Sequence, residues 1–161
     1  MQLTFTAMMD VHLPACADIL ATTPLWRDHY SVTREKALHL LRQGMADTAQ
    51  TLCVALEGEM LVGFAYYGVR GALFHGTYLR LLAVREDLRG QGLGKQIMAY
   101  VEQDVQGTTP HLFLLAAEDN TGAHRFYERL GYQHIGSLPG YVVPHLTEYI
   151  FWKRLVARSG I

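Results

Sequence analysis

The sequence has few cysteines and almost no net charge. Its 161 residues include only two cysteines, Cys16 and Cys53, which have neither zinc-site spacing nor the even-numbered framework of a small secreted domain. Both lie among apolar residues, so we expect buried free thiols, as in a protein of a reducing compartment. The formal net charge of −1 favours neither a nucleic acid nor an anionic membrane as a partner.

Long apolar segments are absent as well. No apolar run approaches the roughly 20 residues that span a bilayer, and the first residues lack the basic stretch of a signal peptide. We therefore expect a cytoplasmic protein that does not enter membranes. Half of the residues are hydrophobic and 18% are charged, which is typical of a folded protein. The length fits one domain, so residues 1–161 are expected to form a single domain.

Apolar periodicity and helix-capping residues predict alternating helices and strands. The expected strands cover residues 3–7, 51–56, 60–69, 77–84, 111–117, 132–137 and 147–155. One expected helix follows an Asp10 cap, and a second runs from Ser31 or Thr33 to Gly44. A third, with Ile97, Val101 and Val105 on one face, runs to about Gln106, and a fourth runs from Asn120 to Gly131. Residues 25–30 are expected as a connector and residues 138–145 as a loop. This order predicts a mixed α/β (α+β) sheet with helices on both faces, and the apolar run 111–117 predicts a strand buried on both faces.

The densest glycine segment is LRGQGLGK, residues 88–95, between an expected strand and an expected helix. The phosphate loop of nucleotide hydrolases does not match, because Arg89 holds its first glycine position and Gln96 follows Lys95. The dinucleotide fingerprint fails as well, because Ile97 replaces its last glycine. The pattern that remains is Arg-x-x-Gly-x-Gly.

Such a loop suits a pyrophosphate. Its amide N–H groups and the first free amides of the following helix converge, and the helix dipole adds positive potential. The side chains of Arg89 and Lys95 add local positive charge. The alternative is a turn whose glycines only let strand and helix pack closely.

Two segments resemble motifs of one known family. Residues 81–103, LLAVREDLRGQGLGKQIMAYVEQ, resemble the central acyl-CoA motif of the GNAT superfamily of N-acetyltransferases, [RQ]-x-x-G-x-[GA]. Residues 114–132, LLAAEDNTGAHRFYERLGY, resemble its second motif: strand, asparagine, helix and F-Y-x-x-L-G-[FY]. The element order agrees over residues 3–155. The resemblance implies a mostly antiparallel central sheet of about seven strands, acetyl-CoA as co-substrate, no metal, and transfer of an acetyl group to an amine in a ternary complex.

The resemblance also implies residue roles. Backbone groups of Leu82, Ala83 and Val84 bind the pantetheine arm and face the thioester carbonyl. Asn120 contacts the pantetheine side, and Tyr127 reaches the thioester sulfur. The pyrophosphate is held by the amides of Arg89, Gly90, Gln91, Gly92, Leu93, Gly94 and Lys95. From the residues alone, Asn120 is equally explained as a helix cap and Tyr127 as a core residue.

The expected chemistry needs a base, an oxyanion donor and an acid. A lysine-like amine with a pKa of about 10.4 must lose its proton before it attacks. We assign the oxyanion to the amide of Val84, and protonation of the departing thiolate to Tyr127. The base is not identified: strand 77–84 has no acid, and Leu115 stands where ribosomal-protein N-terminal acetyltransferases carry a glutamate. His75, Glu118 and His145 remain candidates.

The sequence motifs do not determine the acceptor, the oligomeric state or whether the chain is catalytic. We expect a small-molecule amine to be bound by Trp26, Tyr30, His75, Tyr141 and His145, although the aromatic residues equally suit a cover for the sheet. The competing function is a non-catalytic acyl-CoA-binding sensor or interaction module. The aromatic-rich strand at residues 147–155 and the 50% hydrophobic content predict a homodimer.

Overall fold

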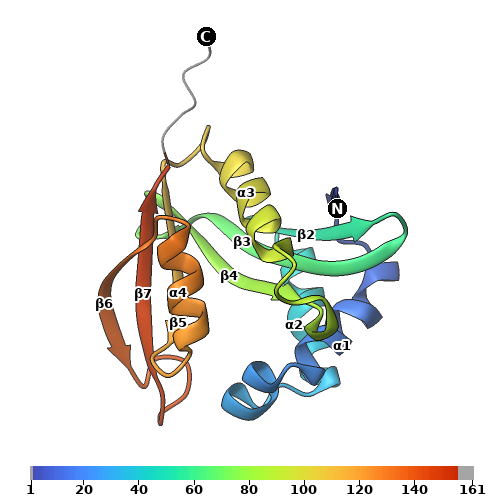
Figure 1. The fold of residues 1–161 in the computed structure, drawn as a ribbon, viewed down its shortest axis with the longest axis horizontal. Helices are drawn as coiled ribbons and strands as arrows, with labels where there is room; N and C mark the ends of the chain where they lie inside the picture. The colour runs from blue at the N-terminus through green and yellow to red at the C-terminus, as the bar shows by residue number, and fades with distance from the viewer. Residues whose placement is uncertain (1, 156–161) are drawn as a thin grey trace. The chain divides into compact units, whose positions relative to one another are not determined.

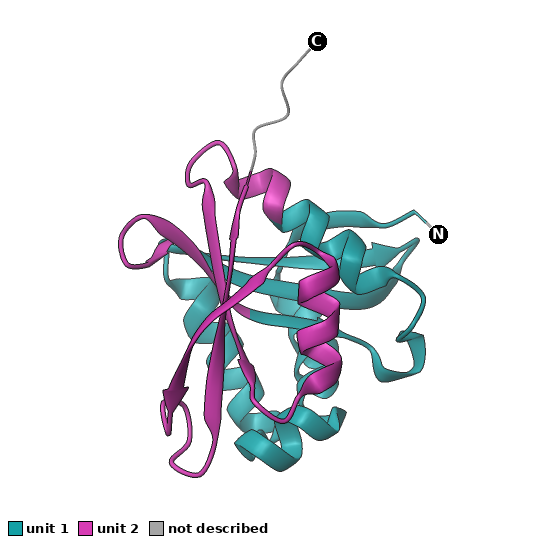
Figure 2. Cartoon of the chain, turned by 60° about the vertical axis from the view of Figure 1, so that its left-hand side comes forward, with its two compact units in different colours: residues 1–68, 81–101 teal, residues 69–80, 102–161 magenta. Residues whose placement is uncertain are grey.

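The computed structural model describes residues 2–155, and these divide into two compact units (Figure 2). Unit 1 consists of residues up to Gly68 together with Leu81–Val101, and unit 2 consists of Val69–Arg80 and the residues from Glu102 onward. The strands form one seven-stranded, mostly antiparallel sheet in the order β1-β2-β3-β4-β5-β7-β6 (Figure 1), which confirms the predicted fold class. Within residues 2–155, no helix has the length and apolarity needed to cross a bilayer.

The two sheet faces of unit 1 carry different helices. Its strands are β1 (Thr4–Ala7), β2 (Gln50–Glu57) and the first part of β3 (Met60–Ala72), paired antiparallel, and the end of β4 (Gly76–Val84). Helices α1 (Leu13–Thr22) and α2 (Arg34–Ala46) form a core with one face, including Leu20, Leu41 and Phe64. On the other face Phe5 stacks on Tyr100 of α3 (Leu93–Val105) at 4.2 Å between ring centroids. Helices on both faces were predicted, and unit 1 has them.

Two local predictions in unit 1, the helix cap at Asp10 and the end of α2, were wrong. Asp10 opens a short 3-10 turn, Asp10–His12, and α1 begins only at Leu13 without a side-chain cap. The expected connector contains a π-helical turn, Leu25–His29. Helix α2 is capped by Thr33, whose Oγ1 accepts from the N–H of Lys36 at 3.2 Å, but it does not end at Gly44.

Unit 2 contains the first part of β4 together with β5 (His111–Ala117), β6 (Gln133–Pro139) and β7 (Thr147–Arg154). Strand β5 is parallel to β4, with Thr77 opposite Leu112, and antiparallel to β7. Helix α4 (Thr121–Arg129) lies alongside these strands (Figure 2). The bounds predicted for β5 are confirmed, but its burial alternates between buried and half-buried residues, so the prediction of a strand buried on both faces was wrong.

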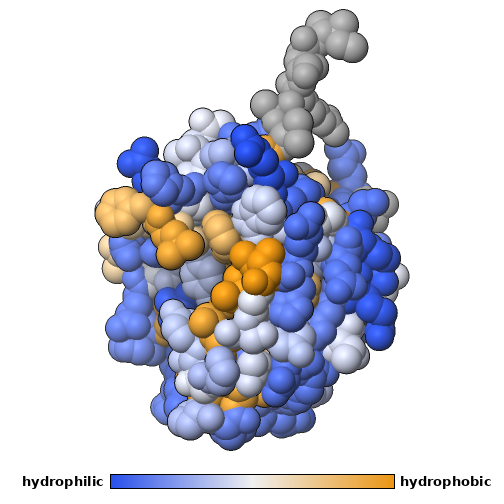
Figure 3. Space-filling model, turned by 90° about the vertical axis from the view of Figure 1, so that its left-hand side faces the viewer, coloured by the Kyte–Doolittle hydropathy of each residue, from blue (hydrophilic) through white to orange (hydrophobic). Residues whose placement is uncertain are grey.

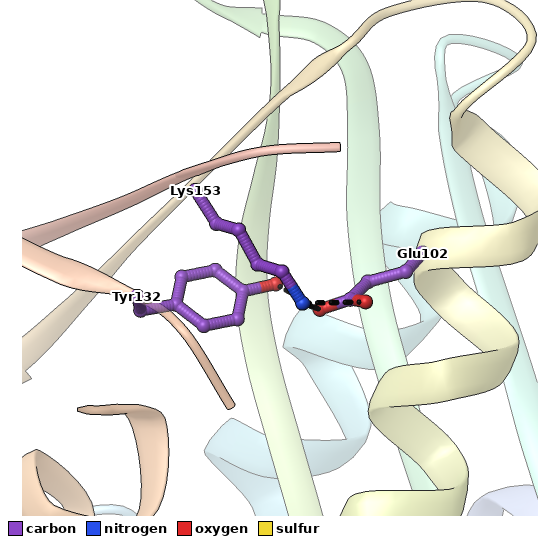
Figure 4. A network of polar contacts seen from close by, with 3 residues as sticks. All are labelled: Glu102, Tyr132 and Lys153. Carbon is purple, nitrogen blue, oxygen red and sulfur yellow. Dashed lines mark hydrogen bonds and ion pairs between the residues drawn. The ribbon is translucent and has the colours of Figure 1, made fainter. Parts of the chain in front are cut away.

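A polar network connects the end of α3 to the strands of unit 2 (Figure 4). The hydroxyl of Tyr132 donates to Oε1 of Glu102 at 2.9 Å. The ammonium of Lys153 on β7 lies 2.9 Å from both carboxylate oxygens of the same glutamate. Burial, followed by the charge of Glu102 and this hydrogen bond, raises the pKa of the Tyr132 phenol. The carboxylate is therefore enclosed by two donors, as a half-buried charge requires.

Candidate functional site

The glycine loop of unit 1 owes its glycines to backbone conformation. Strand β4 ends at Val84, a 3-10 turn covers Glu86–Leu88, and α3 begins at Leu93. Gly90 and Gly92 have φ angles of +78° and +79°, in the left-handed region that other residues avoid. A Cβ at either position would meet no atom within 4 Å. These two glycines therefore do not serve close contact between strand and helix, and the space beside them is open.

Amide groups at the start of α3 precede its hydrogen-bond ladder. The N–H of Gln96 donates to the carbonyl of Gly92 at 3.2 Å, which is the first helical bond. The amides of Leu93, Gly94 and Lys95 come before it, where a helix offers N–H donors to an anion. The N–H of Arg89 is different, because it donates to the carbonyl of Glu86 at 3.3 Å. That amide, which was predicted to contact the pyrophosphate, already makes a hydrogen bond within the turn.

The two flanking cations differ in their surroundings. Nη1 of Arg89 lies 3.0 Å from a carboxylate oxygen of Glu86, and both side chains are about half exposed. Part of the expected positive charge is therefore balanced locally. Lys95 is exposed on the first turn of α3, where a cation is not favoured by the helix dipole. A bound polyphosphate would relieve that repulsion.

The end of β4 approaches β3 unusually closely. A Cβ at Gly63 would lie 2.5 Å from the carbonyl oxygen of Ala83 and 3.3 Å from the Cα of Val84. The N–H of Arg85 donates to the carbonyl of Val62 at 2.9 Å. Because successive N–H groups of an extended strand point to opposite edges, the N–H of Val84 is directed away from β3. Leu82, Ala83 and Val84, the predicted pantetheine-binding residues, thus form a strand end held against Gly63.

Asn120 and Tyr127 lie at the two ends of α4 in unit 2. Oδ1 of Asn120 accepts from the N–H of Ala123 at 3.2 Å, which confirms the predicted helix cap. Tyr127 is 9% exposed and contacts Phe126, Tyr132 and Phe151, with ring centroids 5.0, 5.7 and 6.1 Å away. Burial raises the pKa of its phenol. Its membership of the core is confirmed, whereas a role toward a thioester stays a prediction.

The other predicted residues fall into separate groups. Trp26 and Tyr30 come together in unit 1, with ring centroids 5.8 Å apart, and Trp26 packs against the core. Tyr141 and His145 share the β6–β7 loop of unit 2, where Tyr141 is 66% exposed. The three candidate bases are all exposed: His75 in the β3–β4 turn, Glu118 after β5, and His145.

Sequence reasoning missed Glu148, a carboxylate on β7 that is 1% exposed. Burial raises the pKa of the nearby Tyr78 phenol, the charge of Arg80 opposes that rise, and Tyr141 and Glu148 add to it. The one available signal was an acid inside an otherwise apolar and aromatic strand, TEYIFW. Such a residue is unusual, because burying a carboxylate lowers the stability of the fold unless the charge is paired or hydrogen-bonded.

Comparison with known proteins gives a consistent result. The family model described as "Acetyltransferase (GNAT) family" matches residues 16–132. An L-methionine sulfoximine/L-methionine sulfone acetyltransferase from Pseudomonas aeruginosa is 32% identical over 90 residues, covering 51% of this chain. The match spans 49%, about half, of that relative's length.

Solved structures share the fold. The crystal structure of an acetyltransferase from Thermus thermophilus has a TM-score of 0.81 and 20% identity, covering 96% of this chain and 98% of that one. An aminoglycoside 6'-N-acetyltransferase complexed with coenzyme A has a TM-score of 0.73 and 17% identity, covering 98% and 99%. At this identity the likeness establishes the fold.

Proposed function

Because the chain belongs to the acetyltransferase (GNAT) family, we propose that it is an N-acetyltransferase that moves an acetyl group from acetyl-CoA to a small-molecule primary amine. The observation that carries this proposal is the loop of Gly90 and Gly92, which has a left-handed backbone with open space beside both glycines and leads directly into the first amides of α3. The residues present suit a pyrophosphate there: amides 90–95 donate, while Arg89 and Lys95 supply positive charge.

The proposed reaction is a direct attack in a ternary complex. The neutral amine attacks the thioester carbonyl carbon, and the N–H of Val84 stabilises the oxyanion that forms. The C–S bond then breaks, and Tyr127 gives its proton to the thiolate. The nitrogen loses one proton to water, which reprotonates Tyr127. Leu82 and Ala83 hold the pantetheine arm through their backbone, and Asn120 contacts it while capping α4.

A small-molecule acceptor is favoured by the relatives. The curated relative is named for acetylation of methionine sulfoximine, and one structural neighbour for aminoglycosides. We propose that Trp26, Tyr30, His75, Tyr141 and His145 contribute to its binding. The test is release of the coenzyme thiol from acetyl-CoA with a panel of primary amines: L-methionine sulfoximine, kanamycin, benzylamine and a peptide with a free N-terminus. Coenzyme binding without thiol release for any amine would favour the non-catalytic acyl-CoA-binding sensor.

Gly92→Ala is expected to weaken acetyl-CoA binding at least tenfold, or about 1.4 kcal/mol. An L-residue disfavours the φ of +79° that directs the loop amides toward the pyrophosphate. Calorimetric titration of the folded variant with acetyl-CoA measures the effect. Gly58→Ala is the matched control, because Gly58 also has a positive φ, +60°, and open space around a Cβ, but lies in the β2–β3 turn. Equal affinities for both variants and the wild type would contradict the assignment.

A homodimer is our proposal for assembly. The aromatic residues of β7 support it little, since Phe151 is buried, but Leu73 and Phe74 are 85% and 84% exposed in the β3–β4 turn. Both have positive φ angles, 50° and 66°, a costly conformation that presents apolar groups to solvent. Figure 3 shows separate apolar groups among polar ones on one face of the molecule.

We expect light scattering to give twice the 18.1 kDa chain mass for the wild type. Replacing Leu73 and Phe74 together by serine is expected to give the chain mass itself, because the exposed apolar contact is lost. Val11→Ser is the control, since Val11 is 75% exposed but lies in unit 1. A wild type that stays at the chain mass at micromolar concentration would contradict the dimer.

Two broader proposals accompany this function. The family match runs through residues of both units, which supports one acetyltransferase domain over residues 1–161. Cys16 and Cys53 are buried and neither is in a disulfide, as predicted, which supports the proposed cytoplasmic location.

A further inference from the structure

One face of the unit 2 sheet carries a buried carboxylate. Residues directly opposite in a β-ladder share a face, and successive residues alternate between faces. Glu148 on β7 lies opposite Ala117 on β5 and Leu138 on β6. The same β5–β7 ladder places Leu115 opposite Ile150, so Leu115 is a diagonal neighbour of Glu148 on this face.

Tyr78 and Arg80 share this face with Glu148. Tyr78 lies opposite Phe113, and Phe113, Leu115 and Ala117 alternate along β5 to the position opposite Glu148. Arg80 follows two residues after Tyr78. The opposite face carries Tyr149 and Phe151, which contact α4 through His124 and Tyr127, with centroids 5.1 and 6.1 Å apart. Glu148 and Tyr127 therefore lie on opposite faces of the sheet. The β4–β5 ladder ends at Leu79 and Leu114, and an acyl group at that end can be reached from both faces.

Glu148 is the carboxylate that the described strands of unit 2 place on this face. Strand segments 77–84 and 111–117 contain no aspartate or glutamate. The side chain is 1% exposed, so its charge acts in a medium of low dielectric, where attraction to an ammonium is stronger than in water. Arg80 is exposed, so water and salt screen its charge more effectively. An ammonium beside Glu148 would therefore be attracted more than it is repelled.

Resting on the acetyltransferase function proposed above, we propose that Glu148 binds the ammonium of the amine substrate and accepts its proton, directly or through one water. The carboxylate takes one proton from R–NH₃⁺ and becomes a carboxylic acid, and the free electron pair of R–NH₂ forms the bond to the carbonyl carbon. The C–S bond breaks with its electron pair on sulfur, which takes a proton from Tyr127. The nitrogen loses its second proton to water, and water returns a proton to Tyr127. After product release Glu148 returns its proton to water. This assignment replaces the exposed candidates His75, Glu118 and His145 as the base.

The proposal predicts that Glu148→Gln loses kcat/KM, and that the size of this loss depends on the protonation of the amine. With the panel amine that the wild type acetylates fastest, Glu148→Gln is expected to lower kcat/KM about 10² to 10⁴-fold at pH 7.4. Acetyl-CoA affinity should stay unchanged. Glu128→Gln, an exposed position on α4, is the control and should retain wild-type turnover.

At higher pH a larger fraction of the amine is already neutral in solution, so the reaction depends less on a base of the protein. An amine with a pKa of about 10.4 is roughly one part in a thousand neutral at pH 7.4 and roughly one part in ten at pH 9.4. The gap between Glu148→Gln and wild type should therefore narrow by up to about 100-fold over this range. A residue needed only for folding would give a gap independent of pH. The charge of Glu148 acts on Tyr78 of β4, as do Arg80 of the same strand and Tyr141 in the β6–β7 loop, whereas the ladder neighbours Ala117 and Leu138 do not titrate.

Each outcome decides between the proposals. If the wild type turns over and Glu148→Gln has the same kcat/KM, the role of Glu148 is overturned and the acetyltransferase function stands. The same holds if kcat/KM of the variant falls by a factor that does not change with pH. Absence of turnover by the wild type with every amine overturns both. If Glu148→Gln does not fold, Glu148→Asp, which keeps the charge but shortens its reach, takes its place: at least a tenfold loss in kcat/KM that narrows at high pH supports the assignment, and wild-type turnover overturns it.

Discussion

Tyr127→Phe should lower kcat for acetyl transfer at least tenfold, and up to about 10⁴-fold, while acetyl-CoA affinity and thermal stability change little. General-acid assistance typically contributes about 10² to 10⁴ in rate. The ring of Tyr127 carries its contacts with Phe126, Tyr132 and Phe151, and phenylalanine keeps that ring. The hydroxyl is the only group removed, so a large effect on rate alone would locate its role in the chemistry.

The raised pKa of Tyr127 is compatible with donation to sulfur. Burial keeps its phenol protonated throughout the working pH range, so the proton is always available. The acceptor is affected in the same direction: burial raises the pKa of the Cys16 thiol in this chain to about 12. A coenzyme thiolate formed away from water would likewise bind a proton more strongly than a cysteine-like thiolate of pKa about 8.5 in water. Desolvation therefore shifts donor and acceptor together.

Tyr132→Phe is the matched control for this prediction. Its hydroxyl donates to Glu102 at 2.9 Å, and a hydrogen bond to a charged group contributes about 1.5–3 kcal/mol. We expect that variant to unfold at lower temperature with kcat nearly unchanged, the reverse of Tyr127→Phe. The rates must be measured with an amine for which chemistry limits turnover. A Tyr127→Phe enzyme with the wild-type kcat would mean that Tyr127 serves only as a core residue and that water protonates the thiolate.

Features set by neighbouring residues in the chain could be predicted from the sequence. The caps Thr33 and Asn120 act within three residues, and both are found as expected. Gly131 was predicted to end α4; it follows the C-cap residue Leu130 and has a φ of +90°. The glycine loop also lies where the strand–loop–helix pattern placed it. These elements depend on backbone preferences and local hydrogen bonds, which short sequence patterns encode.

Features that depend on a distant partner could not be predicted. Gly44 was expected to end α2, but the helix continues to Ala46. This glycine instead makes room for Tyr66, because a Cβ there would lie 2.7 Å from the ring. Glu148 attracted no interpretation, because its burial and its neighbours Tyr78 and Arg80 follow from strand order and register. A glycine or an acid in a sequence does not reveal which strand lies beside it.

Gly63→Ala is expected to destabilise the protein by about 1–3 kcal/mol, which lowers Tm by roughly 2–12 °C at this chain length. The added Cβ would lie 2.5 Å from the carbonyl oxygen of Ala83 and 2.9 Å from Cδ1 of Ile97. The isoleucine side chain can rotate, whereas the carbonyl is part of β4 and moves only with its strand. The N–H of Val84 belongs to the same strand end, so we also expect kcat to fall.

Gly136→Ala separates this close approach from the general effect of alanine in a strand. Gly136 lies in β6, and a Cβ there would be 3.5 Å from Cδ1 of Ile150, an ordinary van der Waals distance. Thermal unfolding and acetyl transfer are compared for the two variants. If Gly63→Ala alone loses stability and rate, the separation of β3 and β4 at Ala83 controls where the Val84 amide lies. Wild-type stability and rate in Gly63→Ala would mean that β4 shifts freely, and a strand end that shifts without cost cannot hold an oxyanion donor in a fixed position.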